Sequence, residues 1–163
     1  MKTKEFWITV FSAWMVFIGI DFLFHASLFE TLWHKEIAAL KSQLDLFLLI
    51  PAGYGSFLLL TILTGWVFGL AFSKQPDRKQ YLKTALIFSG LFAASHFLAL
   101  YSFVNVPLKH LLLLSVVYFI ELFAVMTVFY RAVTTRRIRR IIVCSLSLFV
   151  ALLIIGIVIQ NLG

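Results

Sequence analysis

The sequence predicts an all-α fold: a polytopic membrane helix bundle with five transmembrane helices and one interfacial amphipathic helix. The chain has 163 residues, of which 62% are hydrophobic and only 13% are charged, and its mean hydropathy is +1.01. A soluble domain of this length would need much more polar surface. Several apolar runs have the length of about twenty residues that crosses a hydrocarbon layer roughly 30 Å thick. We therefore expect a single integral membrane domain over residues 1–163.

The distribution of basic residues predicts the topology. The apolar runs place the spans at about 6–27, 50–72, 83–104, 108–131 and 141–161. Eleven of the 14 Lys and Arg residues then fall on one side of the membrane: Lys2, Lys4, Lys74, Arg78, Lys79, Lys83, Arg131, Arg136, Arg137, Arg139 and Arg140. The other side has Lys35, Lys41 and Lys109. This positive-inside bias predicts a bacterial cytoplasmic (inner) membrane protein with a cytoplasmic N-terminus and an outside C-terminus.

The net charge of +7 therefore reflects topology, and we expect no nucleic-acid partner. The expected partners are the lipid bilayer and, as an open alternative, other membrane subunits or further copies of the chain.

The first span carries an aspartate and a histidine near its outer end. Asp21 and His25 are four residues apart and so lie on one face of a helix. Asp21 is about 25 Å of helix rise from Lys4, which places it near the outer boundary. We expect the face with Trp14, Ile18, Asp21 and His25 to look into the bundle, because a carboxylate that faces lipid is too costly.

Residues 29–47 predict an amphipathic helix in the outer interface. Its apolar positions recur every three or four residues: Phe29, Trp33, Ile37, Leu40, Leu44 and Phe47. Its polar face has Glu30, His34, Lys41 and Asp45. We expect Pro51 to end this helix and to open the second span. The small residues around Tyr54 indicate either close helix packing or a loosened backbone that lines a cavity.

The third and fourth spans carry the other membrane-embedded ionisable side chains. His96 shares a face with Ser89 and Ala93 in the outer half of the third span. His110 opens the fourth span and Glu121 lies near its middle, and the spacing of eleven residues puts both on one face. The fifth span has no charged or histidine side chain and is typical of an anchor or an oligomerisation helix.

These side chains define the candidate site. The ligand or metal candidates are Asp21, His25, His96, His110 and Glu121, and the secondary candidates are Glu30, His34 and Glu36. Imidazole and carboxylate groups suit zinc, copper or iron, and two facing histidines can hold a haem iron. An aspartate can also orient a neighbouring imidazole, and intramembrane Asp, Glu and His can relay protons. The metal or cofactor stays open, because no ligand motif of fixed spacing is present.

Each candidate also has a purely structural interpretation. The interfacial histidines are then satisfied by headgroups and water, and Glu121 is a protonated carboxyl group bonded across the bundle. An acid pair of Asp21 and Glu121 for hydrolysis is unfavourable, because Asp21 is expected near the outer boundary and Glu121 near the middle. No catalytic residue is assigned.

The order of elements resembles small bacterial multi-span membrane-protein families in which the first span ends in a polar and aromatic cluster. The matching residues here are Asp21, His25, Phe29 and Trp33, with spans up to about residue 131. The fifth span departs from that pattern. The resemblance implies an architecture and no activity.

Three functions follow as hypotheses. The first is a bundle with a polar site in its outer half that binds a metal ion, a haem-like cofactor or a small solute, or conducts protons. The second is a non-catalytic accessory or assembly subunit of a larger membrane complex. The third, a membrane-embedded enzyme, has the least support in the sequence.

Overall fold

The computed structural model describes residues 3–30, 43–72, 76–135 and 137–162, and in these ranges all regular structure is helical. The elements are α1 (Thr3–Asp21), η1 (Phe22–Leu28), α3 (Gln43–Ala71), α4 (Arg78–Phe103), α5 (Leu108–Thr135) and α6 (Ile138–Leu162). Counting α1 and η1 as one, five helices are long and apolar enough to cross a membrane. This confirms the all-α class and the five long helices. Most of the predicted interfacial helix lies outside the described residues.

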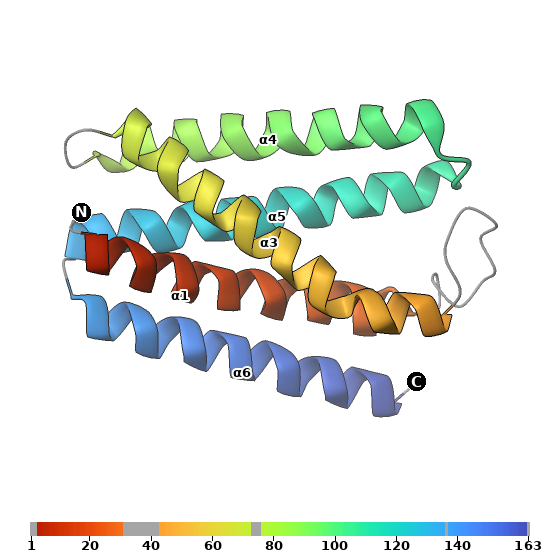
Figure 1. Ribbon diagram of the computed structural model, residues 1–163. Helices are drawn as coiled ribbons and strands as arrows, with labels where there is room; N and C mark the ends of the chain where they lie inside the picture. The colour runs from red at the N-terminus through yellow and green to blue at the C-terminus, as the bar shows by residue number, and fades with distance from the viewer. Residues whose placement is uncertain (1–2, 31–42, 73–75, 136, 163) are drawn as a thin grey trace.

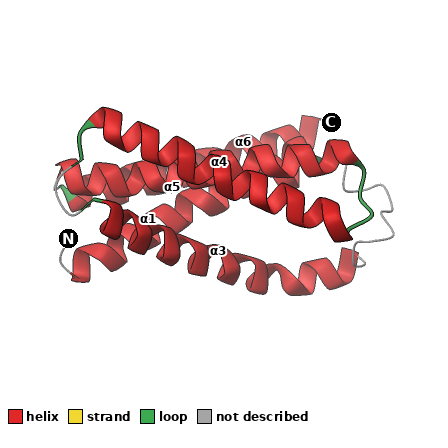
Figure 2. Ribbon diagram, turned by 90° about the horizontal axis from the view of Figure 1, so that it is seen from above, coloured by secondary structure: helices red, strands yellow, loops and turns green. Residues whose placement is uncertain are grey.

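The first helix is the centre of the bundle. It lies between α5 and α6, α4 packs on the far side of α5, and α3 crosses α1 and α5 diagonally (Figures 1 and 2). Half of the apolar window of the first span is buried inside the protein, against 11% for the span within α3. A side chain on α1 is therefore more often buried against other helices than one on α3.

The start of α3 differs from the prediction. The helix begins at Gln43 and continues through Pro51, so the proline neither ends one helix nor opens the next. A proline removes one backbone hydrogen bond, but the remaining turns of a long apolar helix still satisfy their own backbone groups. The indole Nε1 of Trp14 on α1 donates to the backbone carbonyl of Tyr54 at 2.9 Å, which fixes α3 against α1 just beyond the proline.

An apolar core fills the end of the bundle where α1 and α4 begin and α5 ends. Phe17 stacks on Phe57 with ring centroids 4.5 Å apart, and Phe68 stacks on Phe129 at 5.9 Å. A Cβ atom at Gly65 would overlap the Phe129 ring, with Cε1 at 2.7 Å. Glycine at this position therefore allows α3 to approach α5 closely.

The last helix packs along α1 and η1 (Figure 1). A Cβ atom at Gly19 would lie 3.3 Å from the Cα atom of Phe149, so the two backbones approach closely there. The fifth span is therefore an integral part of the bundle and more than the plain anchor expected from its composition. Whether it also mediates oligomerisation stays a prediction.

Candidate metal centre

The site begins where α1 changes its hydrogen-bonding pattern. Asp21 is the last residue of α1, and residues Phe22–Leu28 continue as a π-helix, η1. The amide of Phe29 donates to the carbonyl of Phe24 at 2.8 Å, five residues back. Such turns are rare, occur often at functional sites and are wider than α-helical turns. The wider turn aligns His25 more directly above Asp21 than an α-helix would.

Three ionisable side chains converge at this point. Nε2 of His25 lies 3.7 Å from Oδ1 of Asp21. One ligand atom each of Asp21, His25 and Glu121 can be chosen so that all three lie within 4.8 Å of one another. Two residues come from the first span and one from α5, which α1 contacts along the bundle. Asp21 and Glu121 are 100 positions apart in the sequence, and only the fold brings them together.

The proximity of Asp21 and Glu121 corrects the expectation that they lie at different depths. By helix rise, Asp21 is about 27 Å from the start of α1 and Glu121 about 21 Å from the end of α5. The remaining difference is small, and the two helices are antiparallel (Figure 1). Because each Cα–Cβ bond tilts toward the N-terminus of its helix, the side chains of Asp21 and Glu121 lean toward each other.

Glu121 is the most buried member of the cluster. It is 1% exposed, whereas the side chains of Asp21 and His25 are 19% and 22% exposed. Among the described residues, Oε1 of Glu121 has no hydrogen-bond partner. A buried carboxylate is strongly unfavourable unless a cation or hydrogen-bond donors compensate it. The site thus presents an acceptor oxygen that calls for a cation or a proton.

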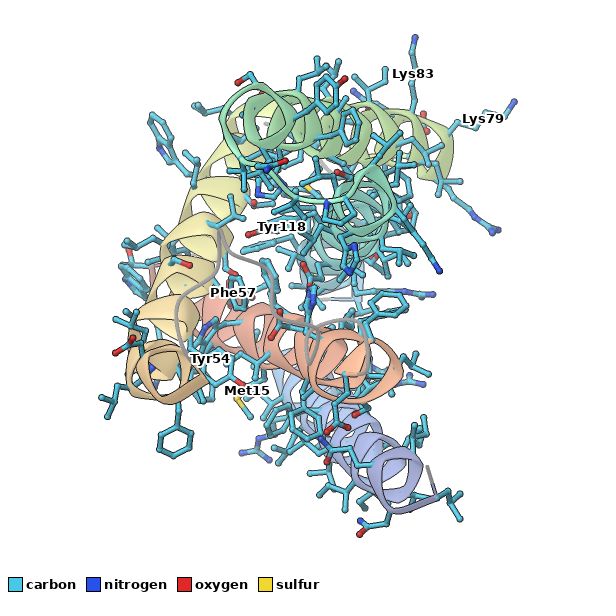
Figure 3. The ribbon with its side chains drawn as sticks, turned by 90° about the vertical axis from the view of Figure 1, so that its right-hand side faces the viewer. Met15, Tyr54, Phe57, Lys79, Lys83 and Tyr118 are labelled. Atoms are coloured by element: carbon cyan, nitrogen blue, oxygen red, sulfur yellow. The ribbon has the colours of Figure 1, made fainter. Side chains whose placement is uncertain are left out.

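One tyrosine shares the helix face of Glu121, and a histidine packs on that tyrosine. Tyr118 lies three residues before Glu121 on α5. Figure 3 shows Tyr118 on the side of the bundle where α3 faces α1 and α5. The ring of His96 packs on Tyr118 with centroids 4.3 Å apart. His96 therefore contacts Tyr118 and replaces none of the three converging side chains.

The predicted candidates therefore separate into two groups. Asp21, His25 and Glu121 come together, whereas His96 and His110 are not members of the converging group among the described residues. His110 is buried in the first turn of α5, about 16 Å of helix rise from Glu121.

Of the secondary candidates, Glu30 is half-buried just beyond η1. His34 and Glu36 lie outside the described residues. Sequence reasoning missed Tyr118. The signal for Tyr118 was its position three residues before Glu121, which places both on one helix face.

The donor set defines the chemistry that the site supports. Two carboxylates and one imidazole suit Zn²⁺, Fe²⁺ or Mn²⁺. None of the three offers the sulfur ligand that Cu(I) prefers. Ligands at about 2.1 Å from a zinc ion are about 3.4 Å apart in a tetrahedral site. The 3.7 Å separation of Asp21 and His25 is close to that value, and a ligand atom of Glu121 lies within 4.8 Å of both.

Searches with this chain find no matching protein-family model, no matching curated protein and no matching solved structure. The class that the fold and the site define is a five-helix bundle of membrane-spanning length with a carboxylate–histidine cluster inside it.

Proposed function

We propose that this protein is an integral membrane protein that binds a divalent first-row transition-metal ion through Asp21, His25 and Glu121. One observation carries the proposal. Three ligand atoms of the types that such ions prefer converge within 4.8 Å, and one of these residues is a fully buried glutamate whose Oε1 has no partner among the described residues. A cation supplies the compensation that this oxygen needs.

The charge balance supports a divalent ion. Two carboxylates and one neutral imidazole together carry a charge of −2, which a divalent ion neutralises. The metal-bound site is then neutral in its low-dielectric surroundings. Three protein ligands leave at least one coordination position, as in metal sites that bind water or a small solute. Asp21 next to His25 also fixes the orientation of the imidazole ring. We assign no reaction to the site.

The proposed location follows from the charge distribution and the length of the helices. The protein spans a bacterial cytoplasmic membrane five times, with the N-terminus in the cytoplasm and the C-terminus outside. Asp21 and His25 then lie in the outer half, close to the end at which α4 and α5 are joined (Figure 1). A metal ion would reach the site from the outer face.

The test is metal analysis of the protein purified in detergent. We expect about one Zn²⁺, Fe²⁺ or Mn²⁺ per chain, retained after dialysis against metal-free buffer. His25→Ala and Glu121→Gln should each weaken Zn²⁺ binding by more than roughly 100-fold. Loss of a residue that only supports a ligand weakens metal binding by at most about that factor. His96→Ala is the matched control, because it removes a half-buried imidazole that packs on Tyr118 and leaves the three ligands in place.

Two results would contradict the proposal. The first is wild-type protein that neither retains metal nor binds added Zn²⁺, Fe²⁺ or Mn²⁺. The second is unchanged Zn²⁺ binding in both His25→Ala and Glu121→Gln. Either result would favour an accessory subunit whose polar residues are structural, and a stably co-purifying membrane partner would then be the next observation to seek.

A further inference from the structure

Helix α6 packs against η1, the segment that carries His25. Nε2 of Gln160 donates to the backbone carbonyl of Ala26 at 2.6 Å, across 134 residues of sequence. Ala26 lies in the last turn of η1, where backbone carbonyl groups lack an amide partner within their own helix. Gln160 therefore satisfies a backbone group that directly follows His25.

A second contact lies one turn earlier on α6. A Cβ atom at Gly156 would lie 2.7 Å from Oγ of Ser27 and 2.8 Å from Cε1 of Phe22. Real Cβ atoms do not approach other atoms so closely, so any larger residue would displace Ser27 or Phe22. These two residues flank His25 on either side in η1. Glycine at this position lets α6 lie directly against the π-helix.

The hydrogen-bonding register of η1 decides where His25 points. A π-helical turn contains one more residue than the α-helical turn that it replaces. If this segment relaxed to an α-helix, each residue of η1 would take a different rotation about the helix axis. His25 would stay on the same face as Asp21, four residues before it, but its direction relative to Glu121 on α5 would change. Something outside the segment must favour the rarer register, and α6 is packed against it.

We propose that Gly156 and Gln160 are positioning residues of the metal site: together they hold η1 in the register that presents His25 to Asp21 and Glu121. This inference rests on the proposed metal binding. It gives α6 a role beyond that of an anchor. It also gives a reason for a glutamine near the end of an apolar helix with a mean hydropathy of 3.1.

The test compares two variants with matched controls. Gly156→Ala forces a methyl group against η1, and its control is Gly65→Ala, which forces one against the Phe129 ring in the apolar core. Gln160→Met removes the donor to Ala26. Its control is Asn161→Leu, which removes a bond of Nδ2 to Ile157 in the same turn, within α6 itself. The two controls measure how a comparable packing or hydrogen-bond change that does not touch η1 affects Zn²⁺ binding.

Two quantities are measured: the dissociation constant for Zn²⁺ and, in the metal-free protein, hydrogen exchange of the peptide that covers residues 22–29. Gly156→Ala and Gln160→Met should weaken Zn²⁺ binding by roughly 10–100-fold, the range for outer-shell partners, and should accelerate exchange in this peptide. Gly65→Ala and Asn161→Leu should leave the dissociation constant within about twofold of the wild type, since distant sites are independent.

The outcomes separate the two proposals. If the wild type binds Zn²⁺ and both α6 variants bind it equally well, the positioning role is wrong and the metal site stands. If the wild type binds no metal, the proposed function fails, and an unchanged exchange rate in both α6 variants would overturn the positioning role as well. Should Gly156→Ala not fold, Gln160→Met alone decides the matter, because its side chain is exposed.

Discussion

The two ends of α1 handle buried polar groups in opposite ways. Near its start, the hydroxyl of Thr9 donates to the carbonyl of Glu5 at 2.7 Å, and that of Ser12 donates to Ile8 at 2.9 Å. Each hydroxyl is thus satisfied within its own helix. At the other end, a carboxylate accepts hydrogen bonds and cannot donate to helix carbonyls. Asp21 therefore depends on other elements, and the same holds for Glu121 facing it from α5.

This difference explains why only one end of the bundle is a candidate site. Thr61 and Thr64 on α3 repeat the local solution, with hydroxyl bonds of 2.8 Å to the carbonyls of Phe57 and Leu60. Ser and Thr can lie in an apolar core at little cost because the helix supplies the acceptor. A buried carboxylate needs a partner from outside its own helix, and the metal ion that we propose for Asp21, His25 and Glu121 would meet that need.

The largest effect is expected in the apolar end. Phe129→Ala should lower the free energy of unfolding by about 3–5 kcal/mol, because it opens a cavity among tightly packed rings. Phe129 is fully buried and packs on Phe68. Thermal unfolding in detergent measures the loss. Zn²⁺ binding by the folded fraction should stay unchanged, and a weakened affinity would show that the two ends do not behave independently.

A smaller change of opposite sign is expected at the polar end. Glu121→Met should raise the stability of the metal-free protein by about 1–3 kcal/mol, because an apolar side chain of similar size replaces a buried group without its full set of partners. The same variant should not bind Zn²⁺. Stability gained together with binding lost is the signature of a functional residue.

The matched control for this variant is Leu122→Met, which changes a neighbouring buried side chain with little effect on stability or binding. A metal-free Glu121→Met protein that is less stable than the wild type would indicate that Glu121 is a structural carboxyl group. It would then count against the contrast between the two ends.

Sequence reasoning predicts the long helices of this chain well and the site only in part. The spans are set by the lengths of apolar runs, so they could be placed within a few residues, apart from the start of α3. There the chain stays helical through Pro51, since a proline weakens a helix locally and the rest of a long apolar helix decides its course. Asp21 and His25 were paired correctly because a spacing of four residues places them on one helix face.

The rest of the site depends on information that lies outside any short stretch of sequence. The convergence of Glu121 on Asp21 follows from the antiparallel packing of α1 and α5 and from the tilt of their side chains. The π-helical segment η1 contacts Gly156 and Gln160, which are more than 120 residues further along the chain. Composition and periodicity report neither of these features.

The smallest effect is expected where a buried hydroxyl is satisfied by its own helix. Thr64→Val removes a fully buried hydroxyl but keeps the shape of the side chain. The carbonyl of Leu60 keeps its backbone partner in α3 and loses only the added bond from the side chain. The free energy of unfolding should therefore change by about 0.5 kcal/mol or less, as measured by thermal unfolding beside Phe129→Ala. A loss of about 2 kcal/mol would mean that this hydroxyl has a partner on another helix. Hydrogen bonding within one helix would then no longer distinguish the apolar end from the candidate metal centre.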